Sequence, residues 1–286
     1  MIRIAILAAA LSVLWPLSAS QGRPAFVPAP AFVPGTLELE YEITVGVFVL
    51  ARTRFRLALD AETFDFKVTV EPGGIPSVFT SFKLKSRANG LKTGALIAPQ
   101  RYRSEYLKQG KLHRSVKIDY GGDHMSQVVT DPTPKEDKRP PLTDPLTAGT
   151  LDPLSAALVL LQTVAESGRC QGTRQVYDGR RLFRVQVQEP TGLIHIAGQP
   201  VGPDGLQKSK MLCHVAISRV AGFREKEIVR QTYPELLLAE LAPVVPGAPW
   251  VPMRITVEAP ESSFGTRAAT LVSVKWRERY TKGTNL

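Results

Sequence analysis

The chain has 286 residues, of which 36 are Lys or Arg and 26 are Asp or Glu, so its formal net charge is +10 at pH 7. This basicity does not indicate nucleic-acid binding, because the basic residues are spread along the chain and are not gathered in a tail or a basic helix. The two cysteines, Cys170 and Cys213, belong to no C-x-x-C motif or Cys/His cluster, which argues against redox catalysis and a zinc site.

The first 20 residues have the order of a secretory signal peptide, with an apolar run from Ile4 to Leu17 after a short basic start. The run contains Pro16 and is shorter than the roughly 20 residues of a spanning helix, which favours cleavage near Ala19 or Ser20 over a membrane anchor. No cysteine near the cut could carry a lipid, and no later stretch is long and apolar enough for a transmembrane helix. We therefore expect a soluble periplasmic protein.

This compartment bears on the cysteines and on the charge. In an oxidising environment the pair Cys170 and Cys213 is expected to form a structural disulfide, which contributes on the order of 3 to 4 kcal/mol. The positive charge suits an anionic envelope component such as lipid headgroups, lipopolysaccharide or acidic polysaccharide. Alternatively, it serves solubility alone.

The folded part is expected to be one β-rich domain over residues 37–286, after a Pro- and Ala-rich leader over residues 21–36. Apolar residues occupy the odd positions from Leu37 to Val49, which predicts one long strand with a single buried face. The same alternation over residues 53–59, and again over 64–70 after a turn at 60–62, predicts a three-stranded meander.

Further turns are predicted at Gly73-Gly74, Asn89-Gly90, Gly110 and Gly121-Gly122. The strand-like runs between them include Val78 to Leu84, Tyr102 to Leu107 and Leu112 to Tyr120. Short strands at this spacing indicate an antiparallel sandwich or barrel and not βαβ units.

A Pro-rich charged loop over residues 131–150 precedes the one strong helix prediction, residues 153–167. Asp152 is a suitable N-cap, Pro153 fits the first helical position, and Gly168 stands where a helix commonly ends. The helix is apolar on nearly every side, so it must be enclosed. We therefore predict a mainly β fold in which a curved antiparallel sheet, a half-barrel, wraps around this helix.

The second half of the chain returns to strands. Asp178-Gly179 predicts a hairpin with a two-residue turn, and alternation predicts strands around Phe183 to Val187, Met211 to Ile217, Met253 to Val257 and Val272 to Trp276. A short helix could start at Pro234 and stop at Pro243, to act as a lid, as a contact surface or as core packing.

Several segments resemble an exported bacterial family catalogued as domain of unknown function 3108. They are Leu151 to Ala156, Cys170, Val176 to Arg181, Cys213, Ala221 to Phe223 and Trp250 to Ile255. The likeness spans nearly all of the chain from Leu37 and is weakest from Arg224 to Pro249. The resemblance implies an exported protein without an established activity, with a fold similar to periplasmic lipoprotein carriers, and it supplies no catalytic residues.

The residues themselves also show little sign of an enzyme. The common hydrolase, nucleotide-binding and zinc-protease motifs are absent from the sequence, and His113, His124, His195 and His214 lack metal-ligand spacing. We expect no catalytic residues, metal or cofactor. Arg52, Arg54 and Arg56 share a strand face that either binds anions or, as we favour, is simply solvated.

Two hypotheses follow for function. The first is a noncatalytic binding or carrier protein that holds an amphiphilic or lipid-like ligand between the concave sheet and the helix. The second is a structural or assembly factor that binds another envelope protein or a polysaccharide through a sheet edge or through Leu236 to Val245. For the first hypothesis the predicted ligand-binding residues are Leu154, Leu158, Leu161, Tyr41, Phe55 and Phe66.

Overall fold

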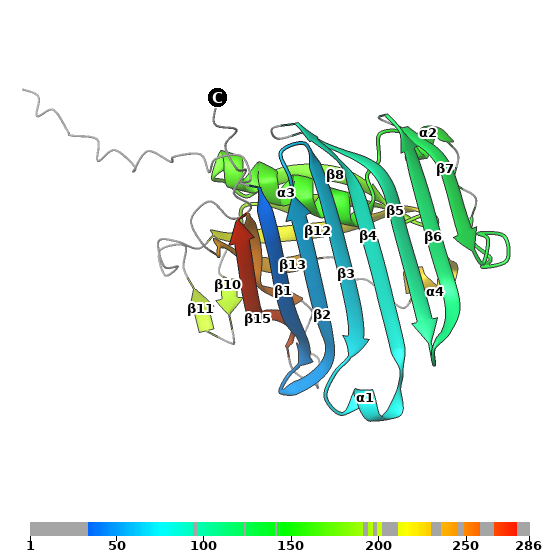
Figure 1. Ribbon diagram of the computed structural model, residues 1–286. Coiled ribbons are helices and arrows are strands. Elements are labelled where there is room, and N and C mark those ends of the chain that lie inside the picture. Colours follow the sequence, from blue (N-terminus) through cyan, green and yellow to red (C-terminus); the bar gives the residue numbers. More distant parts are fainter. Residues whose placement is uncertain are drawn as a thin grey trace, which may run out of the picture.

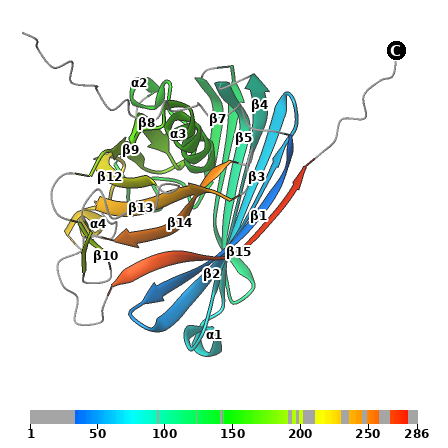
Figure 2. The ribbon, with the colours of Figure 1, turned by 90° about the vertical axis from the view of Figure 1, so that its left-hand side faces the viewer.

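The computed structural model describes residues 34–93, 96–122, 124–140, 142, 144–190, 194–196, 199–201, 211–229, 236–244, 249–257 and 266–278. The predicted signal peptide and most of the predicted leader lie outside these residues. Within them, 13 strands form one antiparallel sheet, and β10 (Ile194–Ile196) pairs with β11 (Gln199–Val201) in a separate hairpin. The fold is mainly β, as predicted, with one curved, open sheet (Figures 1 and 2).

Seven strands form a meander in chain order from β1 to β7. They are β1 (Gly35–Val45), β2 (Phe48–Leu59), β3 (Thr63–Pro72), β4 (Phe82–Thr93), β5 (Leu96–Lys108), β6 (Lys111–Gly121) and β7 (His124–Asp131). The predicted alternation is present. Phe64, Phe66 and Val68 of β3 are buried, while Asp65 and Lys67 between them form an ion pair on the outer face.

The second half of the chain adds its strands to the other side of β1. In spatial order these are β15 (Arg267–Glu278), β14 (Trp250–Val257), β13 (Leu236–Pro243), β12 (Met211–Ala221), β9 (Leu182–Gln188) and β8 (Gln171–Tyr177). Strand β1 therefore lies between β2 and β15, with Gly35 opposite Glu278. Figure 2 shows β12, β13 and β14 curving away from the wall formed by β1 to β7, which gives the half-barrel.

Helix α3 (Pro153–Ser167) lies in the concavity and packs against β4, β5, β8 and β14 (Figure 2). It has the predicted bounds because both caps form. Asp152 Oδ1 accepts the backbone N–H groups of Leu154 and Ser155 at 3.0 Å each, and Gly168 adopts a φ of 63°. The other described helices, α1 (Pro76–Phe79), α2 (Asp144–Thr147) and α4 (Glu225–Val229), are short.

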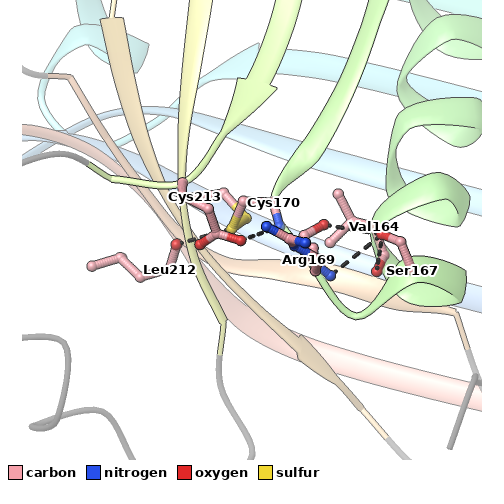
Figure 3. Close-up of a disulfide and its surroundings, with 7 residues drawn as sticks. Val164, Ser167, Arg169, Cys170, Leu212 and Cys213 are labelled. Carbon is pink, nitrogen blue, oxygen red and sulfur yellow. Dashed lines mark hydrogen bonds between the residues drawn. A yellow bond between two sulfur atoms is a disulfide. The ribbon is translucent and has the colours of Figure 1, made fainter. Parts of the chain in front are cut away.

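Cys170 and Cys213 form the predicted disulfide, which joins the chain just after α3 to strand β12 (Figure 3). Their Cα atoms are 5.4 Å apart, and both residues are buried in an apolar cluster with Val164. The helix end is held by the Gly168 N–H, which donates to the Val164 carbonyl at 2.9 Å. The disulfide therefore fixes the end of α3 to the inner face of the sheet.

The predicted long strand from Leu37 to Val49 is wrong, because the chain turns at Gly46 and Val47 and reverses into β2. Gly46 has a φ of 56°, a conformation that glycine adopts at little steric cost. Val47 and Phe48 are apolar but exposed. Because apolar residues continue through the turn, the sequence pattern does not indicate where β1 ends.

The predicted turn at Asn89-Gly90 is also wrong, since both residues lie inside β4. A Cβ atom on Gly90 would overlap the Ala98 carbonyl oxygen of β5, and the β4–β5 register shifts at this point. The glycine marks a bulge with a close backbone approach. The run from Val78 to Leu84 is not one strand either, because the chain forms α1 before β4 begins at Phe82.

The helix predicted between Pro234 and Pro243 is a strand in its described part, β13. It lies between β12 and β14, and Leu238, Ala239 and Leu241 are buried, so the segment is apolar at successive positions and shows no alternation. The hairpin between β8 and β9 is confirmed. Its two central residues are Gly179 and Arg180 and not Asp178-Gly179, because the Asp178 N–H donates to the Arg181 carbonyl.

Candidate functional site

An apolar cavity of about 330 Å³ lies between the concave face of the sheet and α3. Strands β1, β2 and β3 form one wall, and the face of α3 around Ala157 and Leu158 forms the second. Residues of β14 and the segment before it, including Trp250 and Pro252, form the third wall. The fold thus brings together side chains from early, middle and late parts of the sequence around one cavity.

Five of the six predicted ligand-binding residues line this cavity: Tyr41, Phe55, Phe66, Leu158 and Leu161. The sixth, Leu154, lies one helical turn before Leu158. Leu154 is part of the main apolar core and lines a separate cavity. Strand alternation and the apolar helix therefore locate two walls of the cavity.

The sheet wall is aromatic. The rings of Tyr41 and Phe55, on β1 and β2, have centroids 5.3 Å apart in an edge-on arrangement, and the ring of Phe66 on β3 follows at 6.1 Å from Phe55. The Tyr41 hydroxyl donates to the Pro252 carbonyl of β14 at 2.7 Å and so ties the first wall to the third. Burial raises the pKa of Tyr41, so this phenol stays neutral at physiological pH.

Thr53 of β2 also brings a hydroxyl to the described lining. Its Oγ1 is buried and has no hydrogen-bond partner within the described residues. A buried hydroxyl without a partner is unfavourable, because it has lost its water and gained nothing in exchange. The hydroxyl is therefore a candidate contact for a polar atom of a bound molecule.

The third wall is the part of the cavity that sequence reasoning missed. Trp250, Pro252 and Ile255 line it from β14, and Ala269 lines it from β15. The sequence predicts a strand around Met253 to Val257, and the Trp250 to Ile255 segment is among those quoted for the family resemblance, but neither observation places it at the cavity. No local pattern indicates that β15 pairs with β1 and thereby brings β14 close to Tyr41.

A second cavity, of about 460 Å³, lies near the start of α3 and is more polar. Its lining includes Leu154, Tyr102, Arg114 and Arg180. Asp178 and Arg181 of the β8–β9 turn also line it and pair with each other at 2.6 Å.

A buried ion network adjoins this second cavity. Arg139 donates to both carboxylate oxygens of Glu227, at 2.8 and 2.9 Å, and Arg224 donates to Glu227 and Asp137 at 2.9 Å each. Burial alone would raise the pKa of Glu227, but hydrogen bonds from Arg139 and Arg224 outweigh it and lower the pKa to about 2. The network joins the 131–150 loop to α4. Arg114 and Arg180 also lie 3.8 and 3.4 Å from Asp137, and Arg181 lies 3.8 Å from Glu227, so arginines outnumber carboxylates in it.

The outer face of the first strands is solvated, as the sequence interpretation favours. Arg52 pairs with Glu42 at 3.1 Å, and Arg54 and Arg56 lie 3.7 and 3.5 Å from carboxylates of β1. All three arginines are exposed. Such cross-strand pairs contribute little stability each, roughly 0 to 1 kcal/mol.

The described residues contain no group of three or more His, Cys, Asp and Glu side chains placed to hold a metal ion. None of the helices in the described ranges reaches the length and apolarity that crossing a bilayer requires.

The fold and the cavity define a class of β-rich protein in which a curved antiparallel sheet and one helix line an apolar cavity. The chain belongs to the family described as "Protein of unknown function (DUF3108)", whose model matches residues 40–193. These residues include most of β1 and all of α3. The motifs at Cys213, Ala221 to Phe223 and Trp250 to Ile255 lie beyond the matched range.

No curated protein matches the chain. A solved structure of a beta-barrel-like protein of domain of unknown function DUF1849 from Brucella abortus is similar to it, with 11% sequence identity and a TM-score of 0.46. The similarity covers 87% of this chain and 100% of the Brucella chain.

Proposed function

We propose that this protein is a noncatalytic binding or carrier protein of the periplasm, which holds the apolar part of an amphiphilic or lipid-like ligand in the cavity between α3 and β1 to β3. The cavity is the observation that carries the proposal, because its walls are almost wholly apolar. Its volume of about 330 Å³ is at the lower end of the range for small-molecule sites, roughly 300 to 1,000 Å³. A cavity of this volume suits one narrow apolar group of a ligand.

Two features support the compartment. The apolar run from Ile4 to Leu17 has the composition of a signal peptide, and the Cys170–Cys213 disulfide belongs to the kind of bond that persists in oxidising compartments.

The lining chemistry supports binding without catalysis. The described cavity walls carry no His, Asp, Glu, Lys or Cys side chain that could serve as an acid, a base or a strong nucleophile. The Tyr41 hydroxyl is engaged by Pro252, and the Thr53 hydroxyl has no base among its described contacts.

Filling the cavity tests the proposal. Ala157→Phe places a ring in the cavity from α3, whereas Ala58→Phe places the same ring on the outer face of β2 as a matched control. Phenylnaphthylamine, whose fluorescence rises in apolar surroundings, serves as the probe, with a long-chain fatty acid as competitor. We expect saturable binding to the wild type, binding at least about tenfold weaker for Ala157→Phe, and unchanged binding for Ala58→Phe.

A wild-type protein that binds neither the probe nor the fatty acid would contradict the proposal, as would equal binding by the two variants. Thermal unfolding of each variant shows whether the added ring is accommodated. Native mass spectrometry of protein purified from its own cell envelope then identifies the ligand, which we expect to be extractable with organic solvent.

The alternative, a structural or assembly factor, is favoured by one observation. Strand β7 pairs only with β6 within the described sheet and lies at its edge (Figure 1). Its residues Val128 and Val129 are exposed. Such an edge can accept a strand from a partner. The other segment considered, Leu236 to Val245, contains the central strand β13 and does not suit this role. Val128→Lys with Val129→Lys should abolish crosslinking to a partner if the alternative holds.

A further inference from the structure

Three connections of the meander lie at one end of the sheet, the lower edge in Figure 1: those between β1 and β2, between β3 and β4, and between β5 and β6. Antiparallel strands joined in chain order place every second connection at the same end. We name this end the loop tip and define it as residues 46–50, 73–83 and 108–112.

The loop tip exposes large apolar side chains. The exposed fractions are 89% for Val47, 58% for Phe48, 63% for Ile75, 78% for Val78 and 84% for Phe79. Single exposed apolar residues are common on protein surfaces, but a group of them on neighbouring loops marks an interaction site. Among the described residues, Val47 and Phe79 are the most exposed of the large apolar side chains.

Backbone hydrogen bonds hold the three loops together as one surface. The Gly73 N–H donates to the Leu50 carbonyl at 3.0 Å and joins the second loop to the first. The Gln109 N–H donates to the Ser81 carbonyl at 2.8 Å and joins the third loop to the second. The apolar side chains are therefore displayed by a preformed support.

The charge of the loop tip has one sign. Its three segments contain Lys83, Lys108 and Lys111 and no acidic residue. Lys83 pairs with Glu71 of β3, whereas Lys108 and Lys111 are exposed. At the opposite end of the meander, the β2–β3 turn carries Asp60 and Glu62. The two ends thus differ in charge, and the end with the larger group of exposed apolar side chains is the basic one.

We infer that the loop tip docks on the surface of an anionic phospholipid bilayer. Val47, Phe48, Ile75, Val78 and Phe79 enter the interfacial region, and Lys108 and Lys111 contact the headgroups. Projecting apolar side chains beside lysines are the combination that interfacial binding to anionic lipid requires. The site is separate from the ligand cavity, and docking does not depend on the proposed function.

The position of the loop tip also relates to that function. The cavity lining extends along β1 from Leu37 to Ile43, and Ile43 lies three residues before the Gly46 turn. Docking through the loop tip therefore turns this end of the cavity toward the bilayer. If the cavity holds an amphiphile, as proposed above, docking brings the lipid surface to the cavity end that lies nearer the loop tip.

Vesicle co-sedimentation tests the inference, with vesicles of phosphatidylcholine alone and of equal parts phosphatidylcholine and phosphatidylglycerol. We expect the wild type to bind the anionic vesicles and Val78→Ser with Phe79→Ser to reduce binding by about tenfold or more. The matched control is Leu96→Ser, which removes an exposed apolar side chain at the opposite end of the sheet. It should bind like the wild type.

The charge contribution is tested in the same assay. Lys108→Glu with Lys111→Glu should reduce binding by about tenfold or more, whereas Lys135→Glu with Lys138→Glu, the same charge change in the 131–150 loop, should reduce it far less. Equal binding to both kinds of vesicle would overturn the role of anionic lipid.

Two results would overturn the docking site itself. One is a wild type that binds no vesicle, and the other is binding that the loop-tip variants leave unchanged. Sedimentation velocity without lipid tests the other possible partner of the loop tip, a second copy of the chain. If the wild type is a dimer that Val78→Ser with Phe79→Ser converts to a monomer, and no vesicle binds, the loop tip is a contact between copies of the chain and the inference is wrong.

Discussion

Glu227 shows how one side chain holds together segments that lie far apart in the sequence. It accepts two hydrogen bonds from Arg139, 88 residues earlier, and others from the backbone and side chain of Arg224. Arg139 also donates to the Gly222 carbonyl at 2.9 Å. Removing one partner of such a buried pair leaves the other charge uncompensated, which costs more than the intact pair contributes.

Glu227→Gln should therefore lower the free energy of unfolding by about 3 to 5 kcal/mol at pH 7. The pKa of Glu227 is about 2 in the folded protein and near its usual value of 4.5 in the unfolded chain. Its contribution to stability is thus complete above pH 4.5 and is lost as the pH falls toward 2. Urea unfolding between pH 7 and pH 3 should show a flatter pH dependence for Glu227→Gln than for the wild type. The control is Glu225→Gln, an exposed change on the same helix. Equal stability of the two variants would contradict the prediction.

Thr53 shows the opposite situation, a buried polar atom without a partner. Thr53→Val keeps the shape of the side chain and removes the hydroxyl, so we expect the ligand-free protein to gain about 1 kcal/mol of stability. Thermal unfolding measures the change, and Thr69→Val on the outer face of β3 is the control. Destabilisation by Thr53→Val would show that the hydroxyl has a partner, such as an ordered water, in the free protein.

At the level of the elements, prediction succeeded where a signal lies within the element itself. The capping residues Asp152 and Gly168 are adjacent to α3, so they locate both its ends. Prediction failed where the deciding contact is distant. The sequence around Gly90 is typical of a turn, but the close approach of the Ala98 carbonyl makes it a bulge. Pro234 and Pro243 are typical of helix ends, but pairing on both sides makes the described part a strand, β13.

The same distinction applies to the candidate site. Alternation along β1, β2 and β3 places Tyr41, Phe55 and Phe66 on one face, and the apolar helix supplies Leu158 and Leu161. The third wall depends on the pairing of β1 with β15, and the ion network depends on partners such as Arg139 and Glu227 that are distant in sequence. No local sequence pattern predicts the third wall or the ion network.

The disulfide connects two elements, α3 and β12, across a sequence separation of 43 residues. Replacing both cysteines by serine removes the link without leaving a free thiol and should cost about 4 kcal/mol in the chain-entropy model. Guanidinium unfolding of this variant should match that of the reduced wild type. A stability equal to the oxidised wild type would mean that the link constrains the unfolded chain little.

Considered as a whole, the molecule has no division at the end of the matched family range. Ending the chain at Glu189 would remove β15 from the side of β1, β12 from the side of β9 and the third wall of the cavity. We therefore expect residues 34–189 alone to aggregate or to unfold without cooperativity, although the fragment retains α3. Chemical denaturation followed by circular dichroism checks this, with residues 34–278 as the control. A sharp unfolding transition of the shorter fragment would show that it is an independent unit.

The central place of β1 also affects how the molecule is made. Because a chain is synthesised from its N-terminus, β1 emerges early, but its neighbour β15 is the last of the described strands to emerge. One side of β1 therefore has no partner until synthesis is nearly complete. An unpaired strand edge invites pairing with other chains. Glu38, Glu40 and Glu42 along β1 repel a second copy of the same strand. We therefore expect these acids, which form surface ion pairs with arginines of β2 in the folded protein, to disfavour pairing between two copies of β1 before β15 is made.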